Sequence, residues 1–264
     1  MRRLAAAILL AALVSPAGAS AQRWQPDVAG AAAWAAERQG TVTFAVRTGE
    51  RLRGRGLDRQ FPSASVIKAM FMVAYLRQAD VRDRELEVAD RALLAPMIRR
   101  SDNVTATRIR DIVGNAAIVR LADTAGMTRF RIASVWGLSL ITARDQTRFF
   151  LGIEELLPER HRAYAMRLLR RIVPSQRWGM GEVIPNGWRL HFKGGWGSGT
   201  GAVDHQVGLL RRGRHRVAIA VLTVNNPSHA YGKATLRGVS RRLMRGLGPQ
   251  RIGTVGSPEV ALRE

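Results

Sequence analysis

The stretch over residues 66–76 most restricts the fold, because Lys68 is its only charged residue. Its apolar side chains fall on all sides of a helix rather than on one stripe, and such a helix must be buried on most sides. We therefore expect a buried helix over residues 65–78. A hydroxyl of Ser63 or Ser65 can cap its start.

Periodic patterns predict the elements around this helix. Helices are expected over residues 27–39, 89–97, 105–122, 142–157, 161–172 and 231–247. Strands are expected over residues 41–47, 52–57, 188–192, 204–210 and 216–224. The order is helix, two strands, a block of helices, three strands, helix. It indicates an α+β fold in which both chain ends build one antiparallel sheet and the middle forms an all-helical subdomain.

The two ends of the chain differ from this middle. Residues 1–21 carry two arginines, an apolar run and the small residues Ala19-Ser20-Ala21, which is the pattern of a cleavable secretory signal. We therefore expect a secreted or periplasmic protein. Residues 22–247 are expected to form a single domain with a helical insertion at about 66–160, and residues 248–264 a loose tail.

Arginine dominates the charge of the chain. The formal net charge is +22, and only Lys68, Lys193 and Lys233 among the 42 basic residues are lysines. Such a charge attracts polyanions, but the arginines are spread along the chain in runs no longer than two, which favours a solvated surface over a dedicated polyanion site. A lysine in so arginine-rich a chain indicates a position where guanidinium does not serve. The absence of cysteine excludes disulfides and thiol catalysis.

Two of these lysines stand in short motifs. Ser65-Val66-Ile67-Lys68 places a hydroxyl and an amine three residues apart, on one face of a helix. Burial disfavours the ammonium, so a neutral amine could take the serine proton, and the helix N-terminus supplies N–H groups for an oxyanion. The alternative is a capping serine beside a lysine that reaches for solvent.

The other two motifs lie at the ends of predicted elements. Ser101-Asp102-Asn103 precedes a predicted helix. It is either a polar turn with capping residues or part of a site. In a site, Ser101 could relay a proton and Asn103 could hold a substrate amide. Lys193-Gly194-Gly195 ends a predicted strand. There the ammonium could meet a substrate carboxylate, with glycines that admit a ligand close to the backbone, or the segment is an ordinary hairpin turn.

In this order the three motifs resemble the signature of class A β-lactamases and penicillin-binding proteins, S-x-x-K, S-D-N and K-T-G. The resemblance covers residues 22 to about 247. It implies the serine β-lactamase/D-Ala-D-Ala peptidase fold and an oxyanion hole formed by the N–H groups of Ser65 and Trp196, without metal or cofactor. The site residues it implies are Ser65, Lys68 and Ser101 for catalysis, and Asn103, Lys193, Gly195 and Trp196 for substrate binding.

This sequence departs from that signature twice. Gly194 lacks the hydroxyl of the K-T-G motif, which Ser198 or Thr200 could supply. Class A β-lactamases also carry a glutamate, between the second and third motifs, that activates water to cleave the acyl-enzyme. Residues 124–144 contain no Asp or Glu, and the corresponding loop, 127–140, is shortened. We therefore expect acylation without the usual deacylation device.

The remaining histidines and tryptophans carry less information. Their positions are His191, His205, His215, His229, Trp178, Trp188 and Trp196. The histidines lack metal-like spacing and are expected on the surface or in strands. The tryptophans fit a substrate cleft or the core equally well.

Together these features predict a serine hydrolase that acts on β-lactams or related amides and esters, with slow turnover of β-lactams. A peptidoglycan D,D-peptidase or esterase is the nearest alternative, and a non-catalytic, basic exported protein that binds anionic wall polymers is another. We expect a small-molecule substrate, a β-lactam or a cell-wall peptide. We expect no nucleic-acid partner, no stable membrane insertion and at most weak association with anionic polymers. Activity on β-lactams would imply β-lactam catabolism and antibiotic resistance.

Overall fold

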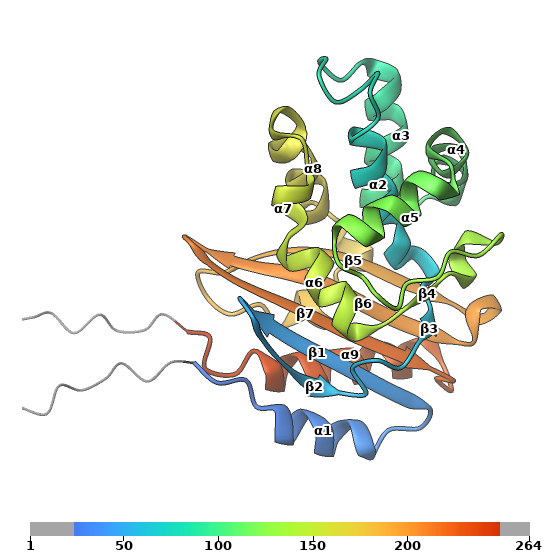
Figure 1. Cartoon of the computed structure of the whole chain (residues 1–264). Helices are drawn as coiled ribbons and strands as arrows, with labels where there is room; N and C mark the ends of the chain where they lie inside the picture. The colour runs from blue at the N-terminus through green and yellow to red at the C-terminus, as the bar shows by residue number, and fades with distance from the viewer. Residues whose placement is uncertain (1–23, 249–264) are drawn as a thin grey trace, which may run out of the picture.

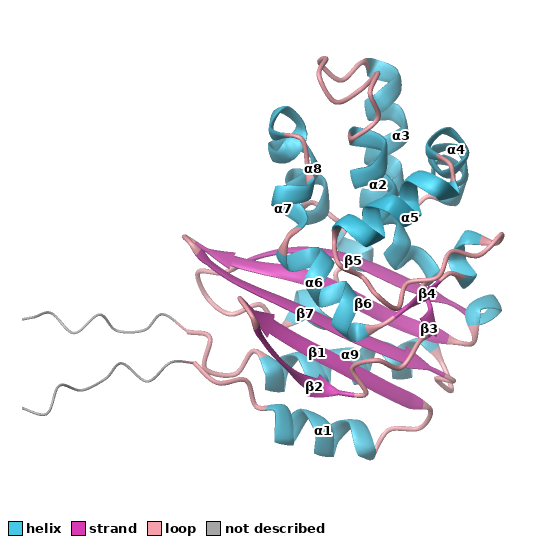
Figure 2. Ribbon diagram, viewed as in Figure 1, coloured by secondary structure: helices cyan, strands magenta, loops and turns pink. Residues whose placement is uncertain are grey.

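The structure is a computed structural model that describes residues 24–248. The predicted signal segment, residues 1–21, and nearly all of the predicted tail, residues 248–264, lie outside the described residues. The described chain is an α+β protein built on a five-stranded antiparallel sheet (Figure 1 and Figure 2). The predicted fold class is therefore confirmed.

The sheet takes its strands from both ends of the chain. Its order is β2-β1-β7-β6-β5, so β1 from the N-terminal pair lies beside β7 from the C-terminal three. The strands are β1 (Thr41–Thr48), β2 (Arg51–Arg55), β5 (Arg189–Gly197), β6 (Val203–Arg212) and β7 (His215–Val224). A short separate pairing joins β3 (Phe61–Pro62) to β4 (Leu140–Ile141).

Helices cover both faces of the sheet. On one face α1 (Val28–Ala36) packs with α9 (His229–Leu243), and on the other face lies α6 (Ala143–Leu151). The helical subdomain stands above α6 in Figure 1. It contains α2 (Lys68–Leu76), α3 (Val88–Arg99), α4 (Asn103–Val113), α5 (Asn115–Thr124), α7 (Ile153–Leu156) and α8 (Glu159–Arg170). None of the helices within residues 24–248 is long and apolar enough to cross a membrane.

The buried helix that the sequence predicts is α2. Every residue of α2 is buried, including Lys68. The first turn differs from the prediction, because Ala64–Ile67 form a short 3-10 helix, η1. Ser63 precedes η1 without capping it. Its hydroxyl donates instead to the carbonyls of Ala64 and Trp136, at 3.2 and 3.3 Å.

Two predicted helices are broken at glycines. The helix expected over residues 105–122 ends at Gly114, whose φ of +73° no helix can continue, so α4 and α5 are separate. The helix expected over residues 142–157 is interrupted at Gly152 between α6 and α7. Apolar periodicity continues across both glycines, which is why the sequence pattern merges the helices.

The strand that carries the third motif is longer than predicted. β5 continues through Lys193 to Gly197, and Gly194 pairs with Gln206 of β6 in the antiparallel register. Glycine disfavours strands, so the run of glycines predicts a turn. The ladder with β6 overrides that preference. The third motif therefore lies inside a strand, and the hairpin interpretation is wrong.

Candidate active site

Three elements bring most of the predicted site residues together. Lys68 opens α2, Ser101 and Asn103 lie at the start of α4, and Lys193 lies within β5. The Lys68 Nζ donates to the Ser101 carbonyl at 2.5 Å, to Asn103 Oδ1 at 2.7 Å and to the Ser101 hydroxyl at 3.3 Å. The Lys193 Nζ donates to the same hydroxyl at 3.0 Å and to the Gly194 carbonyl at 2.8 Å. The Ser101 Oγ thus lies between two buried amines.

The turn of the second motif serves both the helix and the site. Asp102 caps α4, because its Oδ1 accepts hydrogen bonds from the N–H and the hydroxyl of Thr105, both at 2.8 Å. Ser101 has a left-handed φ of +59° and contacts both lysines. Asn103, the first residue of α4, contacts Lys68. The motif is therefore at once a helix cap and a polar contact to the two amines.

β5 runs directly against the turn that carries Ser65. A Cβ atom at Gly195 would lie 2.8 Å from the backbone nitrogen of Ser65 and 2.9 Å from that of Val66, closer than real side chains pack. Only glycine permits this approach. It puts the backbone that follows Lys193 beside the Ser65 amide, as an oxyanion hole between Ser65 and Trp196 requires.

Burial weakens the charged form of both amines. Desolvation lowers the pKa of Lys68 to about 7, although the charge of Asp102 acts to raise it. Burial, and then the charge of Lys68, lower the pKa of Lys193 well below its usual value. Within the described chain, neither amine forms an ion pair or hydrogen bond with a carboxylate. The arrangement therefore favours at least one neutral amine near pH 7.

The Ser65 hydroxyl makes no hydrogen bond to the described part of the chain. Ser65 is half-buried in η1, three residues before Lys68. The spacing puts both side chains on one face, yet the Lys68 amine is directed at Ser101 and Asn103. Proton transfer from Ser65 to Lys68 therefore needs the amine to turn back toward the hydroxyl.

An aromatic ring covers Lys68 from the loop between α5 and α6. The centroid of the Trp136 ring lies 5.1 Å from the Lys68 Nζ, and the ring packs edge-on against Phe71. The indole N–H donates to Thr107 Oγ1 at 3.1 Å, and the Trp136 carbonyl accepts from Ser63. These contacts tie the acid-free loop to α4 and to the turn before η1, with an indole rather than a carboxylate next to Lys68.

The first acids after this loop have other partners. Asp145 is buried in the first turn of α6, where its carboxylate accepts from the Arg129 N–H at 2.9 Å and supports the loop backbone. Burial raises the pKa of this carboxyl, and the hydrogen bond from Arg129 opposes the rise. Glu154 pairs with Arg211 at 2.6 Å, and Glu155 also pairs with an arginine. None of these carboxylates contacts Lys68.

Of the two hydroxyls that could replace the one missing at Gly194, those of Ser198 and Thr200, only that of Thr200 makes a hydrogen bond within residues 24–248. The Thr200 hydroxyl donates to the Gly197 carbonyl at 3.1 Å, and Ser198 is exposed. A Cβ at Gly194 would lie 3.6 Å from the Trp178 ring, which is ordinary contact. Replacement of the hydroxyl by Ser198 or Thr200 stays a prediction.

A polar cluster that the sequence does not predict lies beside the third motif. Asp204 pairs with Trp196 across β6 and β5, and its buried carboxylate accepts from His229 Nδ1 at 2.6 Å. Trp178 and Trp196 pack against His229. The acid and the histidine are 25 residues apart and belong to no local motif, so spacing gives no signal for them.

His205 has the strand role that the sequence predicts. Its Nδ1 accepts from the Thr223 N–H at 3.0 Å, so the ring donates from Nε2 to the Pro62 carbonyl at 2.9 Å. Burial lowers the pKa of His205 to about 4. Across residues 24–248, no group of three acidic, histidine or cysteine side chains is arranged to hold a metal.

The family follows from a comparison of the sequence with family models. The model of the beta-lactamase enzyme family matches residues 82–247, which is more than half of the chain. The chain therefore belongs to the beta-lactamase enzyme family. The match includes the second and third motifs, whereas Ser65 and Lys68 lie before it. No curated protein matches the sequence.

Solved structures show the same fold. A β-lactamase from Sphaerobacter thermophilus superposes with a TM-score of 0.75 at 22% identity, over 85% of this chain and 99% of that one. PBP-A gives 0.70 at 19% identity, over 84% and 95%. An ancestral class A β-lactamase, GNCA, gives 0.72 at 17% identity, over 83% and 98%. The resemblance to the class A fold that the motifs predict is confirmed.

Proposed function

We propose that the protein is an exported serine hydrolase that is acylated at Ser65 by β-lactams or related amides and esters. One observation carries this proposal: two buried lysines share the Ser101 hydroxyl, and no carboxylate within residues 24–248 pairs with either of them. Two ammonium groups so placed repel each other in a medium of low dielectric constant. A neutral Lys68 relieves this repulsion and supplies the base that a serine nucleophile needs.

The proposed acylation uses each motif once. The Ser65 Oγ attacks the carbonyl carbon as its proton passes to the neutral Lys68 Nζ, and the N–H groups of Ser65 and Trp196 bind the oxyanion. The carbon–nitrogen or carbon–oxygen bond then breaks. The leaving atom takes the proton from Lys68 through Ser101, which lies within reach of both amines. Asn103 holds the acyl amide and Lys193 a substrate carboxylate.

We infer slow deacylation from the loop between α5 and α6. Hydrolysis of the ester on Ser65 needs a water activated by a base. The residue over Lys68 is Trp136, whose indole has no basic atom and occupies space beside the amine. This feature favours a long-lived acyl-enzyme. It equally favours a D,D-peptidase that transfers or slowly hydrolyses cell-wall peptides.

Intact-mass spectrometry of the folded protein with benzylpenicillin tests this proposal. We expect an increase by the mass of one penicillin, on the peptide that contains Ser65, with a decay that is slow compared with its formation. Ser65→Ala should take up no label. Ser63→Ala removes the other hydroxyl of this turn and should still be labelled, because Ser65 is the proposed nucleophile. Undiminished labelling of Ser65→Ala would refute the assignment of the nucleophile. A wild type that stays unlabelled would favour the non-catalytic, polymer-binding alternative.

A further inference from the structure

A cavity adjoins the third motif on the other side of β5. Side chains alternate along a strand, so Gly195 faces Ser65 while Trp196 faces away from it. The cavity has a volume of about 390 Å³, and Trp196 is one of its lining residues. Asp204, which pairs with Trp196 in the sheet, points to the same face. The Lys193 Nζ lies 6.0 Å from the centroid of the Trp196 ring, so this wall of the cavity borders the position proposed for a substrate carboxylate.

The cavity contains an acid but no lysine or arginine. Its lining residues are Trp196, Gly197, Ser198, Ala202, Val203, Asp204, Asn226, Pro227, Ser228 and His229. Only the acid and the histidine among them have ionisable side chains. The chain has a net charge of +22, so a cavity lined without arginine or lysine differs in charge from the chain as a whole. The local chemistry therefore favours a hydrogen-bond donor or a cation.

Two hydrogen bonds and the packing of α9 hold the Asp204 carboxylate. The Asp204 carboxylate accepts from His229 Nδ1 at 2.6 Å and from Asn226 Nδ2 at 3.2 Å. A Cβ at Gly232 would lie 1.9 Å from Asp204 Oδ2, so α9 can pack here only with glycine at that position. Burial raises the pKa of Asp204 to about 6, opposed by the hydrogen bond and charge of His229 and by the charge of Lys233. A carboxylate with this pKa is mostly ionised at pH 7.

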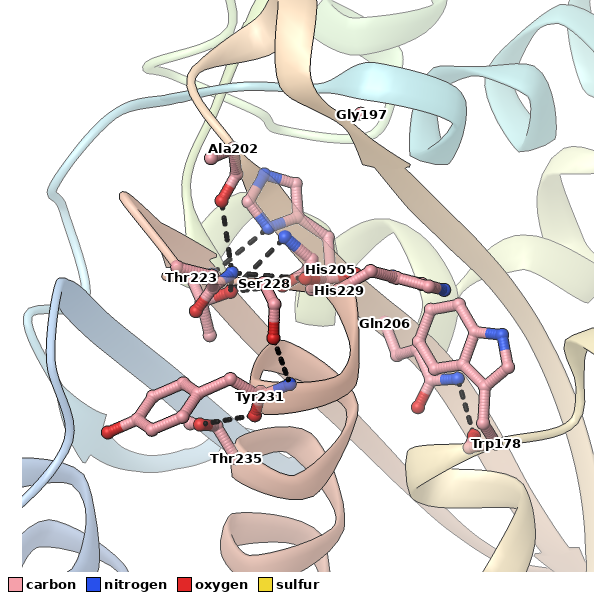
Figure 3. Close-up of polar contacts among 12 residues, drawn as sticks. Trp178, Gly197, Ala202, His205, Gln206, Thr223, Ser228, His229, Tyr231 and Thr235 are labelled. Carbon is pink, nitrogen blue, oxygen red and sulfur yellow. Dashed lines mark hydrogen bonds and ion pairs between the residues drawn. The ribbon is translucent and has the colours of Figure 1, made fainter.

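The His229 ring lies between this carboxylate and two indoles. Its ring is stacked on Trp196 at a centroid distance of 6.0 Å and meets the edge of Trp178 at 5.2 Å. Figure 3 shows this histidine at the start of α9, beside Thr223 and Ser228. The side chain is 43% exposed, whereas that of Asp204 is 2% exposed, so His229 is the cover of the buried acid. The Oδ1 of Asn226, also buried, has no partner in the described chain and adds an acceptor to the same lining.

We propose that this cavity binds a protonated primary amine on the leaving-group side of the substrate, between the Asp204 carboxylate and the Trp196 ring. The ammonium replaces the imidazole of His229, which turns outward into solvent. A carboxylate and an aromatic face are the two groups that bind alkylammonium ions best in proteins. An anionic substituent would meet the buried acid and is excluded. The assignment of the amine to a substrate rests on the proposed acylation of Ser65. The binding of an amine in this cavity does not.

Binding of a simple amine tests the subsite without any chemistry. n-Hexylamine hydrochloride is titrated against the full chain, with hexanol and hexanoate as uncharged and anionic controls, and tryptophan fluorescence is followed. We expect saturable quenching with the amine alone, loss of this response in Asp204→Asn, and tighter binding in His229→Ala. Asp123→Asn, which removes an exposed acid elsewhere, should respond as the wild type does. Equal responses to the amine and to hexanol would overturn the proposal.

Matched esters test the link to the reaction. Two esters are compared that share one acyl group and whose leaving alcohols carry an aminoalkyl or a hydroxyalkyl chain of the same length. We expect the wild type to be acylated about tenfold faster by the aminoalkyl ester, and the ratio to fall to about one in Asp204→Asn. Equal rates in a wild type that labels normally with penicillin would overturn the subsite alone. Failure of every ester and of penicillin to label Ser65 would instead overturn the proposed function, and the amine titration would still decide the subsite.

Discussion

The pH dependence of acylation is the sharpest test of the two-lysine arrangement. A lysine with the ordinary pKa of 10.5 is neutral in about one molecule in 3,000 at pH 7. Burial lowers the pKa of Lys68 to about 7, so about half of the molecules then hold a neutral amine. The gain in reactive form is about 1,500-fold, close to 4 kcal/mol. This is comparable to the whole effect of a general base.

The sign of the effect fixes the shape of the profile. The deprotonated form is the base, so the acylation rate constant should rise about tenfold per pH unit below pH 7 and level off above it. At pH 5 it should be about 100-fold below the plateau. Stopped-flow acylation by a fluorescent penicillin measures this directly. Lys193→Arg fixes a positive charge beside Lys68, so it should move the midpoint below 7 if Lys68 is the titrating base. A rate that still rises tenfold per unit beyond pH 9 would refute the reasoning.

Three further outcomes follow from the geometry. Trp136→Ala should raise the midpoint of the pH profile and speed loss of the acyl group, because water then reaches Lys68; the exposed neighbour Val135→Ala should change neither. Gly194→Ala should keep acylation, because its Cβ would lie in ordinary contact with the Trp178 ring at 3.6 Å. Gly195→Ala should lose acylation, because its Cβ would lie 2.8 Å from the Ser65 nitrogen. Equal effects of the two variants on labelling would contradict this packing. Lys68→Met should raise the thermal midpoint, because it removes a buried amine. The free energy of unfolding, measured with denaturant, should rise by a value on the order of 2 kcal/mol. A lower midpoint would show that the hydrogen bonds of Lys68 outweigh its desolvation.

Much of the fold and most of the site could be predicted because the decisive signals are local. The apolar run around Lys68 has no polar face, so only a buried helix could accept it, and α2 is that helix. The first two motifs lie at the boundaries of elements that periodicity locates well, whereas the third lies inside β5. The boundaries themselves failed where glycine decides them. Gly114 ends a helix that apolar periodicity would continue, and Gly194 stays in a strand because β6 pairs with it.

The rest could not be predicted because it depends on contacts between distant segments. Trp136 lies in a stretch with no regular pattern and reaches Lys68 only when the loop folds back onto α4. The pairing of Asp204 with His229 needs the register of β5 with β6 and the packing of α9 against the sheet. Sequence spacing contains neither.

One physical theme connects the catalytic site with the cavity behind it. On one side of β5, two buried amines share one hydroxyl, and no carboxylate of residues 24–248 pairs with either, so losing a proton or binding an anion stabilises them. On the other side, a buried carboxylate is satisfied by a histidine that is only partly held, and binding a cation has the corresponding effect. A substrate that carries a carboxylate and an amine on its leaving group would satisfy both sides of the same strand at once. The proposed selectivity therefore depends on separating the two charges across β5, and variants that neutralise either side should affect the recognition of one group without the other.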